Sequence, residues 1–173
     1  RAVAKSPYVV GSDFIGEEIN DISDLQPAIK EIVRYINEED KDFTIRIHAG
    51  ENDSLRNNVR KSIMCVKESL EKEQEMPRCR IGHGLYSEDL NTESGKELLK
   101  LMKDTGVVIE FQLTSNVRLN NLSDLKNHPI KIFLKNGIKC VQGTDGGGMY
   151  GSDTFDEQLA LQNLLELSDD EFA

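Results

Sequence analysis

Histidine and acidic residues follow several short apolar runs in this sequence. The segment TIRIHAGE, residues 44–51, runs from mostly β-branched residues into His48 and reaches Glu51 three positions later. His83 follows a second apolar run, and Asp145 follows a third. Imidazole nitrogen and carboxylate oxygen bind zinc, and ionisable side chains beside such a metal can hold or transfer a proton. These residue types therefore indicate metal-assisted hydrolysis, provided that the fold brings them together.

Short apolar runs alternate with amphipathic stretches along the whole chain. The apolar runs predict strands at 7–16, 43–48, 78–82, 106–111 and 138–143. Helical spacing predicts helices within 25–36, 59–70, 98–102, 130–134 and 154–167, and a further helix is expected to start at Ser168. Strict alternation of this kind indicates parallel strands joined by crossover helices, in an α/β sheet or barrel. We expect one domain, or a piece of one, over residues 1–173.

Polar residues sit where the predicted strands end. Ser115 and Asn116 follow the fourth run, just as Glu51, His83 and Asp145 follow others. The carboxyl ends of parallel strands meet at one edge of the sheet, where α/β proteins keep their active sites. Taken alone, such a histidine is more often structural, and such an aspartate is more often a helix N-cap. Their recurrence at several strand ends favours a shared site.

Composition narrows the class of partner. The 173 residues carry a formal net charge of −10, and acids outnumber Lys and Arg, which argues against a nucleic-acid partner. We expect a small-molecule substrate. No apolar run is long enough to cross a membrane and no signal segment opens the chain, so a cytoplasmic protein without a membrane partner is predicted. Cys65, Cys79 and Cys140 are expected to be reduced thiols in or near the core.

Five motifs together resemble the adenosine and AMP deaminase family of metal-dependent amidohydrolases. They are VVGSDFIGEE (9–18), IHAGE (47–51), RIGHG (80–84), TSN (114–116) and GTD (143–145). The resemblance runs from near residue 7 to the end of the chain. It implies a (β/α)₈ barrel of the TIM type, zinc as cofactor, and hydrolytic removal of the 6-amino group of a purine nucleoside or nucleotide.

The resemblance also implies a role for each matching residue. His48 and Asp145 would bind zinc, and Asp145 would also contact the zinc-bound water. Glu51 would donate a proton to the purine ring nitrogen N1. His83 would orient and deprotonate the water, and Gly16 would offer its backbone N–H to the purine.

Two departures from the family pattern qualify these expectations. The His-x-His pair of the family's first strand is missing, so we expect strands four to eight of a partial barrel, without strands one to three. A barrel of this type takes about 250 residues, which matches the shortfall. The missing strands would come from the N-terminal part of the same protein, or an oligomer partner would cover the open edges. The isolated chain is expected to be inactive and to bind zinc weakly or not at all.

Gly146 is the second departure, because it stands where the family usually has an aspartate that contacts purine N7. We expect Gly146 to contact the substrate. Because it replaces the family's aspartate, the exact substrate stays open and includes a related amino-heterocycle. The run 146–148 is interpreted as a close-approach loop, with a phosphate site as the alternative. His128 is interpreted as structural, at the start of a helix. Two other functions stay open: an inactive deaminase-like barrel that serves as a binding or assembly module, and an unrelated α/β binding domain.

Overall fold

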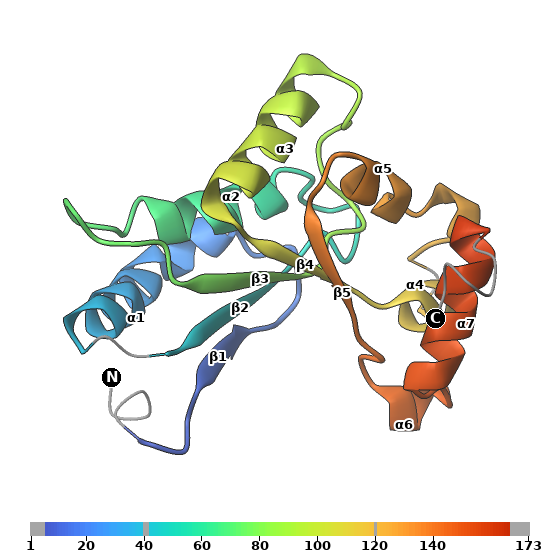
Figure 1. Ribbon diagram of the computed structural model, residues 1–173, viewed down its shortest axis with the longest axis horizontal. Coiled ribbons are helices and arrows are strands. Elements are labelled where there is room, and N and C mark those ends of the chain that lie inside the picture. The colour runs from blue at the N-terminus through green and yellow to red at the C-terminus, as the bar shows by residue number, and fades with distance from the viewer. Residues whose placement is uncertain (1–5, 40–41, 120, 167–173) are drawn as a thin grey trace.

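A parallel sheet of five strands forms the centre of the molecule (Figure 1). The computed structural model describes residues 6–39, 42–119 and 121–166. In this part of the chain the strands are β1 (Gly11–Phe14), β2 (Thr44–Ala49), β3 (Arg78–His83), β4 (Val108–Phe111) and β5 (Lys139–Gln142). They lie side by side in the order β1-β2-β3-β4-β5, and every pair is parallel. This confirms the predicted strand order and direction, although β1 is shorter than expected.

Helices follow the strands in alternation. Those described are α1 (Gln26–Glu38), α2 (Asn58–Lys67), α3 (Glu93–Thr105), α4 (Leu113–Arg118), α5 (Ile130–Lys135), α6 (Gly147–Tyr150) and α7 (Thr154–Leu165), with 3₁₀ turns η1 (Ile22–Leu25) and η2 (Leu125–Asn127). The predicted helices are confirmed, except that the one expected from Ser168 lies outside the described residues. Short helices α4 and α6 were not predicted, because each falls within or beside a stretch that was assigned to a strand end or a loop.

One face of the sheet is apolar and buried. Ile45, Ile47, Ile81 and Ile109 alternate along β2, β3 and β4 and are at most 1% exposed. They form one cluster with apolar residues of α1, α2, α3 and α5, which lie against this face (Figure 1). Burying a side chain of this size contributes about 1.5–3 kcal/mol. This packing fixes the strands relative to one another.

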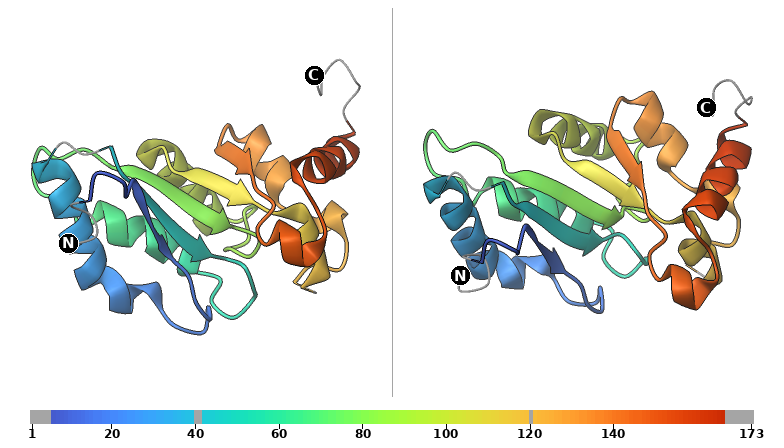
Figure 2. Two further views of the ribbon diagram at one scale, coloured as in Figure 1. Left: turned by 90° about the horizontal axis from the view of Figure 1, so that it is seen from below. Right: turned by 60° about the horizontal axis from the view of Figure 1, so that its bottom comes forward.

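The opposite face of the sheet is polar. In the right view of Figure 2, β2, β3 and β4 lie in front of α2 and α3. Arg46 on β2 lies opposite Asp13 on β1 and Arg80 on β3 in the strand register. Its guanidinium pairs with Asp13 and, at 2.7 Å, with Glu110 on β4. An ionic cluster therefore occupies this face of the sheet.

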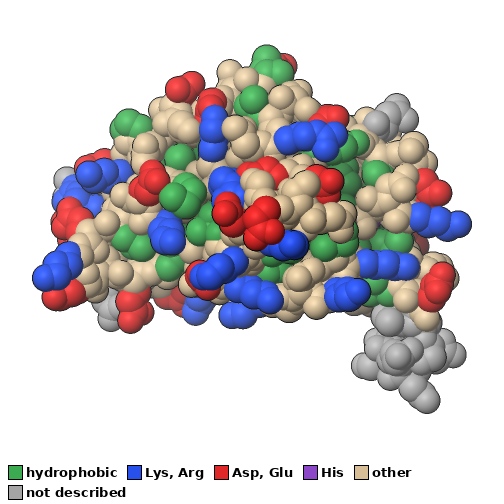
Figure 3. Space-filling model, turned by 90° about the horizontal axis from the view of Figure 1, so that it is seen from above, with side chains coloured by type: hydrophobic (Ala, Val, Ile, Leu, Met, Phe, Trp, Pro, Cys, Tyr) green, Lys and Arg blue, Asp and Glu red, His purple; other side chains and the backbone are tan. Residues whose placement is uncertain are grey.

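Charges of both signs are spread over the surface. Figure 3 shows Lys, Arg, Asp and Glu side chains interspersed over the face seen from above.

Cys65 and Cys79 are buried and free, and burial raises the pKa of the Cys79 thiol to about 12. Within the described ranges, no helix combines the length and apolar character that a membrane crossing requires.

The buried face generates a prediction about stability. Ile45→Ala should lower the free energy of unfolding by about 2–5 kcal/mol, because it opens a cavity under the helices. Ile15→Ala is the matched control, since Ile15 is 71% exposed and Ile45 is 0% exposed. The control should change stability by no more than about 0.5 kcal/mol. Urea unfolding of the wild type and the two variants measures both changes in the free energy of unfolding. Equal changes in the two variants would contradict this description of the core.

Candidate active site

Three metal-ligating side chains converge at the carboxyl edge of the sheet. His48 lies near the end of β2, His83 ends β3, and Asp145 follows β5. One donor atom from each of the three lies within 4.8 Å of the others. The two imidazole rings are 5.3 Å apart at their centroids. Two imidazoles and a carboxylate form a donor set that zinc accepts, so these residues could hold a metal ion.

The backbone at this cluster is strained. His83 has φ 69° and Asp145 has φ 53°, in the left-handed region that non-glycine residues seldom adopt. Such a conformation costs of order 1–3 kcal/mol and is concentrated at functional sites. Gly50, in the turn after β2, has φ 76°, and a Cβ there would lie 2.3 Å from the carbonyl oxygen of Tyr86. Only glycine fits that position.

Charged neighbours contact His48 on both ring nitrogens. Its Nδ1 is 3.1 Å from Oδ1 of Asp13, and its side chain is 6% exposed. A carboxylate bound to one ring nitrogen orients a histidine and makes it a better metal ligand. Arg46 Nη1, however, lies 3.2 Å from Nε2 of His48. The guanidinium therefore occupies space next to a nitrogen that would face a metal.

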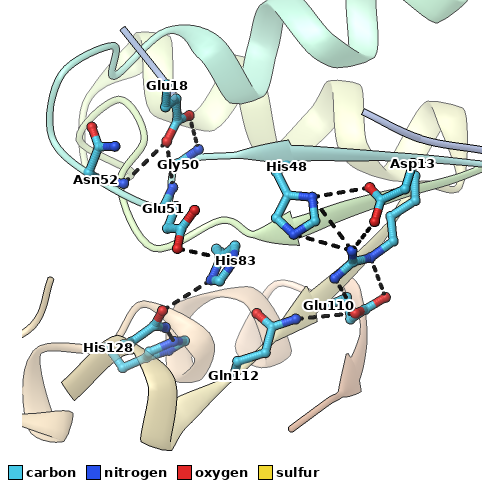
Figure 4. Close-up of polar contacts among 12 residues, drawn as sticks. Asp13, Glu18, His48, Gly50, Glu51, Asn52, His83, Glu110, Gln112 and His128 are labelled. Carbon is cyan, nitrogen blue, oxygen red and sulfur yellow. Dashed lines mark hydrogen bonds and ion pairs between the residues drawn. The ribbon is translucent and has the colours of Figure 1, made fainter. Parts of the chain in front are cut away.

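Glu51 and His83 form the part of the site that can handle protons. Oε1 of Glu51 is 3.7 Å from Nε2 of His83 (Figure 4). His83 is 0% exposed, and among the described residues its Nε2 has no hydrogen-bond partner. Burial lowers the pKa of the His83 imidazole, and the Glu51 carboxylate acts in the opposite direction. The imidazole is therefore neutral near pH 7 and offers Nε2 to the site.

A buried carboxylate holds the turn that carries Glu51. Glu18 is 6% exposed and accepts the backbone N–H groups of Gly50, Glu51 and Asn52, the last two at 2.7 and 3.2 Å (Figure 4). It also accepts the side-chain amide of Asn58 at 3.0 Å. Because one carboxylate accepts several backbone N–H groups in succession, these hydrogen bonds fix the turn. The position of the Glu51 backbone therefore depends on Glu18.

A pocket of about 340 Å³ opens beside His48. Gly16, which follows β1, lines it together with Phe14, Leu25 and Asn58. The pocket is large enough for a small organic ligand. Gly16 and the predicted metal ligand His48 thus line the same pocket.

Gly146 lies apart from this pocket, as the residue before α6. A Cβ at Gly146 would approach the Met149 and Tyr150 side chains, at 2.7 and 3.1 Å. Those atoms are the far ends of flexible side chains, and φ is −84°. A larger residue can therefore be accommodated here.

Several residues that shape the site were not identified from the sequence. Asp13, Glu18 and Arg46 lie within segments that were quoted as motifs, but their contacts join segments that are distant in the chain, so the motifs did not indicate their roles. Arg46 and His48 do share one face by the two-residue period of a strand, which was an available signal. His128 accepts the N–H of Ile130 at the start of α5, at 3.1 Å, as expected of a residue that opens a helix.

Comparison with known proteins agrees with the sequence motifs. The sequence model of the family described as adenosine deaminase matches residues 3–173. An adenosine deaminase from Plasmodium gallinaceum is 33% identical over 163 residues, which are 94% of this chain and 40% of that protein. The chain thus spans about two fifths of the length of this curated relative.

Solved structures share the fold. The Arabidopsis N6-mAMP deaminase MAPDA superposes with a TM-score of 0.70 at 22% identity, covering 95% of this chain and 42% of that one. Arabidopsis ADAL complexed with IMP superposes with a TM-score of 0.70 at 21% identity. The match covers 95% of this chain and 41% of that one. Five parallel strands with outer helices, matching two fifths of such proteins, form a partial barrel of the (β/α)₈ type. With the family match over nearly every residue, this chain belongs to the adenosine deaminase family.

Proposed function

We propose that the protein containing this chain is a zinc-dependent hydrolase that removes an amino group from a purine nucleoside, a purine nucleotide or a related amino-heterocycle. The observation that carries the proposal is the convergence of His48, His83 and Asp145 beside Glu51 at the carboxyl edge of the sheet. Metal ligands and a proton donor are the two requirements of hydrolytic deamination. Family membership supports the same reaction class.

His48 and Asp145 are the residues proposed to hold the metal. Their fit rests on the donor atoms that converge within 4.8 Å and on the Asp13 carboxylate bound to His48. When bound, zinc makes water a nucleophile at neutral pH by lowering its pKa. A catalytic zinc site usually takes three protein ligands, so a further ligand from another part of the protein is part of the proposal.

Glu51 is proposed to donate the proton. Addition of oxygen at the carbon that bears the amino group places electron density on the adjacent ring nitrogen. A protonated carboxyl group at that nitrogen relieves this charge. The turn that Glu18 fixes delivers Glu51 to the site, while His83 faces the same space and would orient the attacking water. Gly16 would bind the ring through its backbone N–H.

The substrate class follows from the pocket and from Gly146. Position 146 lacks the carboxylate with which the family usually holds the purine, so the base has one fewer polar anchor. Solved relatives are described as complexes with the nucleotides IMP and GMP. The nucleotide complexes support a purine-type ligand, whereas the missing carboxylate keeps nucleosides, nucleotides and other amino-heterocycles within the proposal.

The chain is proposed to form one domain unit that supplies strands four to eight of a complete barrel. Support comes from the polar face of the sheet, opposite the face that packs on α1, α2 and α3, and from the two fifths of each relative that the chain spans. Strands one to three, from another part of the same protein, would close the barrel over the Arg46 cluster. A partner subunit that covers β1 and β5 is the alternative way to pair these edges.

A non-catalytic binding module is the second candidate. The observation that favours it is the Arg46 guanidinium 3.2 Å from Nε2 of His48, because a fixed cation there opposes metal binding. Metal analysis of the complete protein separates the candidates. One metal ion per chain supports the enzyme, whereas no metal in wild type together with metal uptake by Arg46→Ala supports the binding module.

Glu51→Gln keeps the shape of the side chain but has no acidic proton to donate. In the complete protein kcat should fall by about 10²–10⁴, with metal content unchanged. The assay follows ammonia release and the ultraviolet change from an aminopurine to a hydroxypurine. Glu97→Gln, at an exposed position on α3, is the matched control and should keep full activity. Retained activity in Glu51→Gln would remove this residue from the proton-donor role.

His48→Ala should show a different pattern, because it removes a ligand. Metal content and activity should be lost together. An active, metal-loaded His48→Ala protein would contradict the proposed ligand set.

Glu18→Gln tests whether the buried carboxylate positions Glu51. The amide keeps one acceptor oxygen but sets an N–H₂ group against backbone N–H groups, so the turn should loosen. We expect a lower kcat and faster amide hydrogen exchange at Gly50 and Glu51, with metal retained. The exposed Glu97→Gln on α3 again serves as control. Unchanged exchange in Glu18→Gln would show that the turn holds its shape without this carboxylate.

Gly146→Asp restores a carboxylate at the position where the family usually has one. The backbone angle and the flexible Met149 side chain allow the change. We expect a lower KM for adenosine, because the base gains a hydrogen-bond acceptor. Gly148→Asp, where a Cβ meets nothing within 4 Å, controls for added charge. An equal response of the two variants would argue against a base contact at position 146.

A further inference from the structure

Two side chains of α6 occupy the space beside Gly146. A Cβ at position 146 would lie 2.7 Å from Cε of Met149 and 3.1 Å from Cε2 of Tyr150. The ring of Tyr150 therefore packs on the backbone of Gly146, which directly follows Asp145 in the chain. Because α6 begins just beyond the carboxyl end of β5 (Figure 1), this ring lies at the same edge of the sheet as the candidate active site.

The hydroxyl end of the Tyr150 ring is the end that lies closer to Gly146. Cε2, which is bonded to the carbon that bears the hydroxyl, is 3.1 Å from the Cβ position, whereas Cδ2 is 3.6 Å from it. A side chain at position 146 would extend its polar atoms into this region. The Tyr150 hydroxyl thus lies next to the space that an aspartate at position 146 would occupy.

The short helix α6 holds Tyr150 in a defined place. The backbone N–H groups of Met149 and Tyr150 donate to the carbonyl oxygen of Gly146 at 2.7 and 2.9 Å, and that of Ser152 donates to Gly147 at 3.2 Å. A Cβ at Gly147 would lie 2.6 Å from the carbonyl oxygen of Ser152, so glycine is required for this close approach. The glycines therefore build the turn that presents Tyr150.

The Tyr150 hydroxyl is available to a ligand. The side chain is half-buried, and among the described residues its hydroxyl makes no hydrogen bond. Burial, followed by the carboxylates of Asp145 and Glu51, raises the pKa of this hydroxyl. Both carboxylates are therefore close enough to act on the phenol. At neutral pH the phenol keeps its proton and can donate a hydrogen bond.

We propose that Tyr150 is a substrate-binding residue whose hydroxyl donates a hydrogen bond to a ring nitrogen of the ligand, in place of the carboxylate that position 146 lacks. The proposal rests on the proposed deaminase function for the class of ligand, a purine-type ring. A phenol donates to an unprotonated ring nitrogen directly, whereas a carboxylate must first take up a proton. Gly146 and Tyr150 together therefore select rings that offer an acceptor nitrogen on this side, and they disfavour analogues that carry a C–H there.

Calorimetric titration of the complete protein with a 6-oxopurine ribonucleoside measures binding without turnover. Tyr150→Phe removes the hydroxyl and keeps the ring, so the dissociation constant should rise about 3- to 10-fold. Tyr8→Phe removes a hydroxyl from a side chain that is 92% exposed before β1, and it should leave the dissociation constant unchanged. An unchanged dissociation constant in Tyr150→Phe would overturn the proposal.

The 3-deaza and 7-deaza analogues of the same nucleoside locate the contact, because each carries a C–H in place of one ring nitrogen. The loss of affinity in Tyr150→Phe should vanish for the analogue that lacks the contacted nitrogen and persist for the other. An equal loss for the parent nucleoside and both analogues would show that the hydroxyl acts through the protein structure. That result would overturn the contact with the ring.

Gly146→Asp tests whether the hydroxyl and a carboxylate at position 146 serve one role. The change should tighten binding more in the Tyr150→Phe background than in wild type, because the wild-type hydroxyl already makes the contact. Equal gains in the two backgrounds would show that the positions act independently and would contradict the shared role.

Failure of the underlying function remains distinguishable from failure of this proposal. A protein that binds the nucleoside through Tyr150 but releases no ammonia from any aminopurine would keep the binding role and reject the deaminase function. An active protein whose Tyr150→Phe variant binds as tightly as wild type would do the reverse. A complete protein that neither binds the nucleoside nor releases ammonia would overturn both.

Discussion

Burial of one sheet face against the helices is the constraint on which the site depends. Ile45 and Ile47 of β2 are 0% exposed in the same cluster as residues of α1 and α2. This packing fixes the strands relative to one another, so the turns after β2, β3 and β5 meet at the same edge of the sheet. The opposite face then carries the polar residues, and His48 shares that face with Arg46 because both alternate with buried isoleucines. The same alternation that builds the core therefore aims the proposed metal ligand.

Buried carboxylates stabilise the turns after β2 and β4 in the same way. Glu18 accepts three backbone N–H groups after β2, and Glu157 of α7 accepts those of Leu113 and Thr114 after β4, at 3.0 and 3.1 Å. Glu157 is 1% exposed and lies at the amino end of α4, where a negative charge is favourable. One carboxylate thus supports Glu51, and the other supports the helix that carries Asn116.

Periodicity and chain order were sufficient to predict the strands, their parallel direction and the shared edge. Local patterns decide those features: period-two alternation in strands, helical spacing between them, and short polar turns after each run. The left-handed backbone of His83 and Asp145 could not be predicted, because tertiary contacts impose it. The ionic contacts of Arg46 and the carboxylate cap from Glu18 join segments that are distant in the chain, so the sequence carries no local sign of them. Asn116 was noted at a strand end, but its contact with His128 depends on how α4 and α5 pack.

Oxygen transfer from solvent tests the central claim most directly. The metal-loaded complete protein would be incubated with aminopurine nucleosides, nucleotides and bases in H₂¹⁸O, and the products examined by mass spectrometry together with ammonia release. The account predicts one ¹⁸O atom in the product for each ammonia released, because water replaces the amino group. A fully metal-loaded protein that gives neither labelled product nor ammonia with any of these compounds would contradict it.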